Sequence, residues 1–231
     1  MFIYPEIPAN NRKNFYLSKA PVYDLFIAVK PPAPKCKAKV DVGFILDSSG
    51  SLRNNYQDEK DFMKNLAGAF GIAPDGSRAG VITFSYYSEH SIKMKDHTDI
   101  NTFNKAVDAI PLMGSTTRID RALRLTQKEL FAPENGGRPG IIKILILLTD
   151  GTQTQDVGAE DPGYITDEIR NSGVAVIVIG IGPGTNQTEL NHMAGGPDNA
   201  FSAASFEELV GGGFIGEIAK KSCEEGMMYF D

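Results

Sequence analysis

Short and almost uninterrupted apolar runs alternate along this chain with segments of helical periodicity. The strongest run, 141–148, contains seven apolar residues out of eight, and similar runs cover 40–46, 79–84 and 174–181. Runs of this length that are rich in β-branched residues are typical of strands covered on both faces. Strands that alternate with helices predict an α/β fold with a doubly wound, mostly parallel central sheet flanked by helices. The alternating segment 91–95 is predicted to be an antiparallel and more exposed edge strand.

Apolar residues at helical spacing predict helices between these strands. A capping box, Ser205 followed by Glu208, predicts the start of a last helix that runs toward Cys223. The three glycines at 211–213 are expected to weaken this helix, by about 1 kcal/mol each relative to alanine. The other predicted helices fall at 56–70, 103–110, 119–130, 161–171 and 187–194, and a short last strand falls at 200–201.

Both ends of the chain differ from this regular pattern. Residues 1–35 hold six of the thirteen prolines and end in Lys30-Pro-Pro-Ala-Pro-Lys35, which is typical of a stiff extended linker. The predicted organisation is therefore a proline-rich extension over 1–35, one domain over 36–223 and a short tail over 224–231. We assign no function to the extension.

The composition excludes some classes of function. The chain has 231 residues, 42% of them hydrophobic and 23% charged, which suits one globular domain with a sizeable core. A net charge of −6 leaves no basic footprint of the kind that binds nucleic acid. The chain contains no run of about 18 apolar residues, so no membrane-spanning segment is predicted. The segment 22–29 is too short and too interrupted for a signal peptide, so we expect a mature chain or a fragment without its leader.

Two features favour a secreted protein. Cys36 and Cys223 stand at the two edges of the predicted domain, as expected of a disulfide that ties its ends together; two free thiols are the alternative. Such a bridge closes a long loop and would stabilise the fold by a few kcal/mol. Asn186-Gln-Thr188 matches the acceptor pattern for N-glycosylation. Together these features indicate an extracellular setting.

Small oxygen-bearing side chains gather in three loops. Asp47-Ser-Ser-Gly-Ser51 follows the first strand, Gly114-Ser-Thr-Thr117 precedes the 119–130 helix, and Thr149-Asp-Gly-Thr152 follows the strongest strand. In parallel sheets, ligands bind beyond the carboxyl ends of the strands, where such loops converge. Carboxylates and hydroxyls are hard ligands that suit Mg²⁺ or Ca²⁺ and suit zinc poorly. The sequence therefore predicts a divalent metal site at this edge.

The first of these loops has a spacing that suits a shared cation. Gly50 permits a tight turn, in which Asp47, Ser49 and Ser51 converge on one point. The two carboxylates and three hydroxyls of these loops would leave a cation open on its outer side, and Mg²⁺ usually keeps some coordination positions for water. An open position accepts a carboxylate, so such a site can recognise an acidic side chain of another protein. A plain turn after a strand is the alternative for this loop taken alone.

The pattern Asp47-x-Ser49-x-Ser51, together with Thr116 and Asp150, resembles the metal-ion-dependent adhesion site of von Willebrand factor A domains. The resemblance extends over about 39–223, through five blocks in the family's order. It implies that Ser49, Ser51 and Thr116 contact the metal through their hydroxyls. It also implies that Asp47 and Asp150 act mainly through waters or from behind the direct ligands, and that an Asp or Glu of the bound protein completes the coordination.

The resemblance also implies a class of function. Thr116-Thr-Arg-Ile-Asp120 and the flanking cysteines are similar to extracellular matrix members of the family, such as matrilins, collagen VI chains and invertebrate byssal or skeletal matrix proteins. We expect an adhesion module that binds a matrix protein, collagen or another ligand with an acidic residue, through one divalent cation. Mg²⁺ is favoured, with Mn²⁺ or Ca²⁺ as alternatives. The second hypothesis is a structural protein of a fibre or mineralised tissue, in which the metal mainly fixes the loops. Self-association and the identity of the ligand stay open.

Neither a catalytic site nor a nucleotide site is predicted. His90, His97 and His192 stand far apart and match no catalytic or metal-ligand pattern. Gly180-Ile-Gly-Pro-Gly184 follows a strand, but a dinucleotide-binding loop requires a third glycine where Gln187 stands. We therefore expect a binding protein rather than an enzyme.

Overall fold

A six-stranded sheet forms the centre of the fold, which a computed structural model describes for residues 38–211 and 213–228. The strand order is β3-β2-β1-β4-β5-β6, and every neighbouring pair is parallel except β2 and β3. This topology confirms the predicted doubly wound sheet with one antiparallel edge strand. The strands are β1 (Val40–Asp47), β2 (Arg78–Phe84), β3 (Ser88–Ile92), β4 (Ile142–Thr149), β5 (Val174–Ile181) and β6 (Ala200–Ala203).

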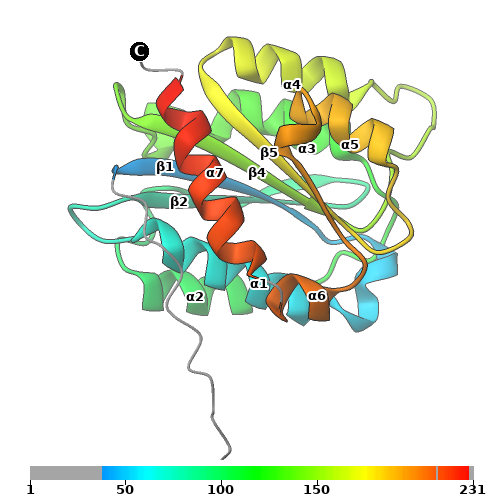
Figure 1. Cartoon of the computed structure of the whole chain (residues 1–231), viewed down its shortest axis with the longest axis horizontal. Helices are drawn as coiled ribbons and strands as arrows, with labels where there is room; N and C mark the ends of the chain where they lie inside the picture. The colour runs from blue at the N-terminus through cyan, green and yellow to red at the C-terminus, as the bar shows by residue number, and fades with distance from the viewer. Residues whose placement is uncertain (1–37, 212, 229–231) are drawn as a thin grey trace, which may run out of the picture. The chain divides into compact units, whose positions relative to one another are not determined.

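Helices cover both faces of the sheet (Figure 1). One face carries α1 (Tyr56–Phe70), α2 (Ile100–Asp108), α6 (Phe206–Gly211) and α7 (Phe214–Met228). The other face carries α3 (Ile119–Leu125), α4 (Pro162–Asn171) and α5 (Gln187–Ala194). The shorter helical segments are η1 (Gly50–Asn54), η2 (Thr126–Leu130), η3 (Pro133–Asn135) and η4 (Pro197–Asn199).

The two covered faces explain why the central strands read as continuous apolar runs. On β4, Ile144, Ile146 and Leu148 pack into the core beneath α1 and α7, whereas Leu145 and Leu147 pack beneath α3 and α4. All five side chains are fully buried. Because successive side chains of a strand point to opposite faces, a strand covered on both sides needs apolar residues at every position.

Two glycines allow a helix to pack directly on the sheet. Gly43 of β1 and Gly80 of β2 are paired across the two strands, and a Cβ atom at either position would overlap the side chain of Leu130. Leu130 ends η2, a π-helical turn that follows α3 directly. The glycine pair therefore forms a depression in the sheet that Leu130 fills, and this contact holds α3 in place.

The last predicted helix forms as two separate helices, divided at the glycines that are expected to weaken it. One half of the capping box forms as expected, with Glu208 N donating to Ser205 Oγ at 3.3 Å. The Glu208 carboxylate accepts instead from Ala204 N, one residue before Ser205, at 2.6 Å. The helix that the capping box opens ends at Gly211, and α7 begins at Phe214. Gly213 has φ of +84°, in the left-handed region that favours glycine, so the chain turns between two separate helices.

The edge strand lies a few residues earlier than predicted. It spans Ser88–Ile92 and not 91–95, because Lys93 and Asp96 form a turn in which Lys93 N donates to the Asp96 carboxylate and Asp96 N donates to Lys93 O. No helix in the described part of the chain is long and apolar enough to span a membrane. The predicted extension and Cys36 lie outside the described residues, so the domain boundaries stay a prediction.

Candidate metal centre

The first and third oxygen-bearing loops meet because their strands are parallel neighbours. Leu46 of β1 pairs with Leu148 of β4, so the residues that follow, Asp47 and Thr149, reach the edge of the sheet together. Thr149 Oγ1 donates a hydrogen bond of 2.7 Å to Asp47 Oδ2. Asp150 then begins the loop that leaves β4 beside the Asp47 loop.

The second loop, 114–117, is hydrogen-bonded to the first. Gly114 N donates to Ser48 O and Gly50 N donates to Ser115 O, both at 2.8 Å. These two backbone bonds run in opposite directions between the loops, so they fix both the separation and the register of the two segments. All three predicted loops therefore converge at one point on the carboxyl edge of the sheet.

Two pairs of side-chain oxygens at this point have the spacing of neighbouring ligands around a small divalent cation. Ser49 Oγ lies 3.0 Å from Ser51 Oγ, and Ser51 Oγ donates to Asp150 Oδ1 at 2.8 Å. Ligands about 2.1 Å from a common Mg²⁺ at right angles are about 3.0 Å apart. In the described part of the chain, no group of three or more His, Cys, Asp or Glu side chains is arranged for a metal. A cation here would depend on serine and threonine hydroxyls as well as on carboxylates, and the donors fit.

Asp47 lies behind these oxygens and shapes the loop. Its side chain is fully buried, its Oδ1 accepts from Ser49 N at 2.8 Å, and its Oδ2 accepts from the Thr149 hydroxyl. Both oxygens are thus already used within the protein. This arrangement supports the expectation that Asp47 acts on the cation from behind the direct ligands.

The structure separates the two adjacent threonines of the second loop. Thr116 is exposed, and its carbonyl oxygen accepts from Ser85 Oγ at 3.0 Å. Thr117 is half-buried, and a Cβ atom at Gly151 would lie 3.6 Å from its hydroxyl oxygen. Gly151 follows Asp150 directly. The hydroxyl of Thr117 therefore lies beside the Asp150 loop, which makes Thr117 a second candidate for the role predicted for Thr116.

Sequence reasoning missed a third carboxyl group below the loop. Glu59 of α1 is fully buried, and its Oε1 accepts from Asp47 N at 3.2 Å. Its Oε2 has no hydrogen-bond partner within the described residues. The available signal was positional: Tyr56, Glu59 and Met63 follow helical spacing on the buried face of α1, so Glu59 occupies a position at which an apolar residue is expected.

Burial and mutual repulsion disturb the ionisation of these carboxyl groups. Burial raises the pKa of Asp47 from 3.8 to about 6, despite the opposing hydrogen bonds from Thr149 and Ser49. Burial also raises the pKa of Asp150, and it raises the pKa of Glu59 well above its usual range, with the charges of Asp47 and Asp150 adding to the effect on Glu59. Three carboxyl groups in a poorly hydrated region repel one another, and a bound cation would relieve that repulsion.

We expect both cation affinity and stability to depend on pH near this site. Protons compete with the cation for Asp47 as the pH falls through about 6, so Mg²⁺ should bind more weakly at pH 5 than at pH 7.

The stability of the metal-free protein should also depend on pH. Between about pH 4 and 6, the Asp47 carboxyl group keeps its proton in the folded state and loses it in the unfolded state. The Asp47 contribution to stability therefore decreases as the pH rises through that window. Thermal unfolding at these pH values with chelator and with Mg²⁺ tests this. An Asp47→Asn variant should lose this contribution, and an identical pH dependence in both proteins would contradict the assignment.

A close approach explains the glycine-rich segment that follows β5. A Cβ atom at Gly184 would collide with the carbonyl oxygen of Asp150. The glycine thus lets this segment pack against the backbone of the candidate metal loop, which gives Gly180–Gly184 a structural role beside Asp150.

The sequence of this chain matches one known protein family over most of its length. The family model of the von Willebrand factor type A domain matches residues 41–212. The chain belongs to this family. This agrees with the topology and with the convergence of the three loops.

Two relatives of this von Willebrand factor type A domain are matrix proteins. The human collagen alpha-6(VI) chain is 34% identical over 176 residues, which cover 75% of this chain and 8% of the collagen chain. Proximal thread matrix protein 1 from the mussel byssus has a solved structure with a TM-score of 0.76 and 28% identity, covering 83% of this chain and 50% of that one. The chain thus spans at most about half the length of these relatives. They confirm the predicted extracellular matrix type of the family and the predicted setting outside the cell.

A further structure of the byssus protein bears on the metal. It has a zinc-occupied motif of this adhesion-site type and is 27% identical to the present chain, with a TM-score of 0.76. Such a motif therefore holds a divalent cation in a relative, which supports a divalent cation in this von Willebrand factor type A domain. In that relative the motif accepts zinc, contrary to our expectation that such donors suit zinc poorly.

Proposed function

We propose that this domain is an adhesion module of the extracellular matrix that binds a protein partner through a divalent cation. The observation that carries the proposal is the cluster at the carboxyl edge of the sheet in which Ser51 Oγ lies 3.0 Å from Ser49 Oγ and 2.8 Å from Asp150 Oδ1. Ser51 is exposed, so a cation held there would be accessible to another molecule. The matrix relatives support the setting, and a collagen is one candidate partner.

Each residue of the cluster has a separate task in this proposal. Ser49, Ser51 and one threonine hydroxyl would hold the cation, and Asp150 would lie against it directly or through water. Asp47 and Thr149 fix the loop from behind. When bound, the cation supplies a positive centre with a coordination position for a carboxylate of the partner. We propose Mg²⁺ as the cation, with Mn²⁺, Ca²⁺ and zinc as the other cations to compare.

The two neighbouring threonines give a direct test of the ligand set. We expect Thr117→Val to weaken Mg²⁺ binding by about tenfold or more, because it removes the hydroxyl beside the Asp150 loop while keeping the shape of the side chain. Thr116→Val is the matched control and should change the affinity less. Isothermal titration with Mg²⁺ measures both variants, and the opposite order would return the role to Thr116.

Binding to matrix proteins in the presence and absence of chelator tests the function itself. We expect the domain to be retained on immobilised collagen, or on another matrix protein with exposed acidic residues, in Mg²⁺ and released by a chelator. The thermal midpoint should then change little. Retention that persists in chelator while the midpoint falls would contradict this proposal and favour the alternative, in which the metal mainly fixes the loops.

We also propose that Cys36 and Cys223 form the predicted bridge. Cys223 of α7 is disulfide-bonded, while Cys36 lies outside the described residues. Peptide mapping of the non-reduced protein should recover the two cysteines in one linked fragment that separates on reduction. Two free thiols in protein from its native source would contradict the bridge.

Glycosylation of Asn186 is likewise a proposal. Asn186 is exposed and caps α5, with its Oδ1 accepting from Thr188 N at 2.9 Å. This geometry uses the side-chain oxygen and leaves the amide nitrogen, where the glycan is attached, unused by the cap. The site is therefore accessible without loss of the helix cap.

A further inference from the structure

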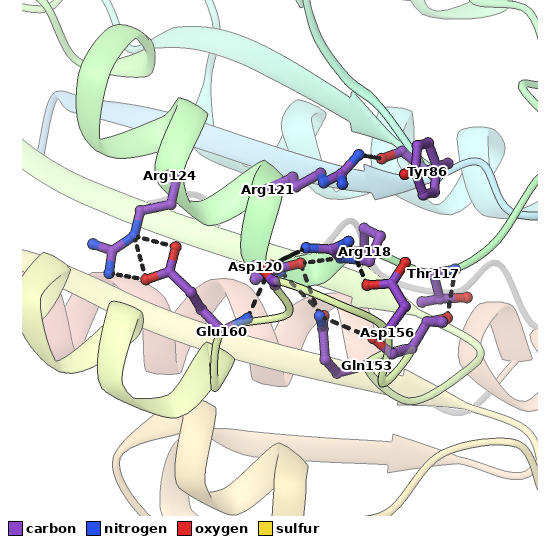
Figure 2. A network of polar contacts seen from close by, with 11 residues as sticks. Tyr86, Thr117, Arg118, Asp120, Arg121, Arg124, Gln153, Asp156 and Glu160 are labelled. Atoms are coloured by element: carbon purple, nitrogen blue, oxygen red, sulfur yellow. Dashed lines mark hydrogen bonds and ion pairs between the residues drawn. The ribbon is translucent and has the colours of Figure 1, made fainter.

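An open cavity of about 590 Å³ lies beside the candidate metal centre, between the segment after β2, helix α3 and the 157–160 loop. Three arginines line it, at the N-cap of α3 and on the helix itself: Arg118, Arg121 and Arg124. Figure 2 shows these arginines together with the carboxylates around them. They differ in whether their charge is already neutralised, and that difference indicates what the cavity binds.

All three nitrogens of the Arg118 guanidinium group donate hydrogen bonds to carboxylates of the protein. Its Nε and Nη2 donate to the two oxygens of Asp120 at 2.8 and 2.7 Å, and its Nη1 donates to Asp156 at 2.6 Å. The side chains of Arg118 and Asp120 are only 2% and 3% exposed. This pair forms a buried floor and offers no charge to a ligand.

Arg124 is neutralised as well, at the opposite end of the cavity. It forms ion pairs with Glu160 and Glu168 at 2.5 and 2.6 Å. The two acidic residues that line the cavity, Asp120 and Glu160, are therefore each bonded to an arginine.

Arg121 lies between them and has no such partner. Within the described residues, no carboxylate lies within ion-pair distance of Arg121 or of Lys128, which also lines the cavity. The Arg121 guanidinium lies 4.2 Å from the centre of the Tyr86 ring, and its Nη1 donates to Tyr86 O at 2.7 Å. Stacking and one hydrogen bond thus hold the guanidinium in place and leave its other donors available (Figure 2).

Apolar side chains at the rim of the cavity are exposed. Tyr87 is 73% exposed and Val157 is fully exposed, and both line the cavity. Tyr87 also packs edge-on against Tyr86, with ring centres 4.8 Å apart. A fixed cation flanked by exposed aromatic and aliphatic side chains has the composition of a protein-binding surface.

Buried Ser85 links the segment after β2, beside the cavity, to the second loop of the candidate metal centre. Its hydroxyl donates to Thr116 O at 3.0 Å and accepts from Ser115 N at 2.8 Å, both in the second loop. The neighbouring residue in the chain is Tyr86, on which Arg121 is stacked. Arg121 is therefore held on a segment that is hydrogen-bonded to the second loop of the candidate metal centre.

We propose that an acidic segment of the protein partner docks on this surface, which is formed by Tyr87, Arg121, Lys128 and Val157. One carboxylate of the segment would bind the metal, and Arg121 would bind another carboxylate of the same segment. The proposal rests on the metal-dependent adhesion function proposed above. It adds a requirement for the partner: a single acidic residue is not sufficient for full affinity, and a second one must lie nearby. Charge complementarity selects an acidic segment, because Arg121 and Lys128 are the cations of this cavity without a carboxylate partner in the described part of the chain.

Two fluorescent peptides test this surface in the presence of Mg²⁺. One is hexaglutamate, which offers carboxylates at several spacings, and the other has a single glutamate among glycines and asparagines. We expect the unmodified protein to bind hexaglutamate more tightly than the single-glutamate peptide in fluorescence anisotropy. Arg121→Gln should weaken hexaglutamate binding by about tenfold and leave single-glutamate binding unchanged.

Arg53→Gln is the matched control, since Arg53 is exposed on η1, next to the metal loop, and the substitution makes the same change in net charge. An equal loss in both variants would overturn the proposal, because it would indicate a general charge effect. If Arg121→Gln does not fold, Arg121→Lys replaces it: it keeps the charge and loses the planar fork, and full hexaglutamate affinity in it would overturn the role of Arg121. Metal-dependent binding of both peptides, with hexaglutamate affinity unchanged in Arg121→Gln, overturns this proposal alone. Hexaglutamate binding that depends on Arg121 but not on metal overturns the metal-dependent function alone, and no binding of either peptide overturns both.

Discussion

Replacement of Arg118 by alanine is expected to destabilise the fold by about 3–5 kcal/mol. The substitution leaves Asp120 charged and buried, with Gln153 Nε2 and Glu160 N as its remaining donors. Removing one partner of a buried ion pair costs more than the pair contributes, because the remaining charge stays out of water. Equilibrium unfolding in urea measures the loss.

Arg124→Ala is the matched control for this prediction. Arg124 also contacts two carboxylates, but its side chain is 38% exposed and those of Glu160 and Glu168 are 51% and 54% exposed. Water replaces such contacts at little cost, so we expect a loss of about 1 kcal/mol or less. Equal destabilisation by the two substitutions would contradict the role given to burial.

The same ion pair predicts sensitivity to acid. Burial alone would raise the pKa of Asp120, but the hydrogen bonds from Arg118 and Gln153 outweigh it and lower the pKa to about 2. Because this folded-state pKa lies below the usual 3.8, the stabilisation is present above about pH 4. It is lost as the pH falls toward 2. In Arg118→Ala this part of the acid sensitivity should be smaller.

Asp47→Asn is expected to weaken Mg²⁺ binding by about 10- to 100-fold. The amide keeps the shape of the side chain and an oxygen that can accept from Ser49 N, but it removes the charge behind the cation. The metal-free variant should be at least as stable as the unmodified protein, since it removes one of three mutually repelling carboxyl groups, two of them fully buried. Titration calorimetry and thermal unfolding of metal-free protein measure the two effects.

Asp58→Asn controls for the change in net charge, because Asp58 is exposed on the first turn of α1. It should leave the affinity for Mg²⁺ nearly unchanged. An Asp47→Asn variant that binds Mg²⁺ as tightly as the unmodified protein would remove Asp47 from the metal centre.

The sequence was sufficient to predict the features that depend on the order of the elements. Apolar runs such as 141–148 predict buried strands because both faces of a parallel sheet are covered, and the structure has β4 at Ile142–Thr149. The convergence of the Asp47 and Asp150 loops follows from the same topology, since parallel neighbours end at one edge of the sheet. These predictions need only the pattern of the chain.

Features that depend on packing between distant segments were not predictable in this way. Glu59 lies under Asp47 because α1 crosses the face of the sheet at that point. Arg121 has no carboxylate partner within the described residues, because other arginines bind the nearby carboxylates. The distinction between Thr116 and Thr117 depends on which way each side chain leaves an irregular loop. Helical spacing indicates that Glu59 is buried, but residue type and spacing do not identify the partners in these contacts.

The π-helical turn at Thr126–Leu130 ties the position of α3 to the length of the chain. Leu130 must reach the depression above Gly43 and Gly80, while Arg118, at the other end of α3, must reach Asp156. One residue of an α-helix corresponds to a rotation of about 100°. Deletion of a single residue from this turn would restore ordinary helical spacing but rotate one of these two contacts away from its partner. The number of residues between them is therefore itself constrained, largely independently of which amino acids occupy the turn.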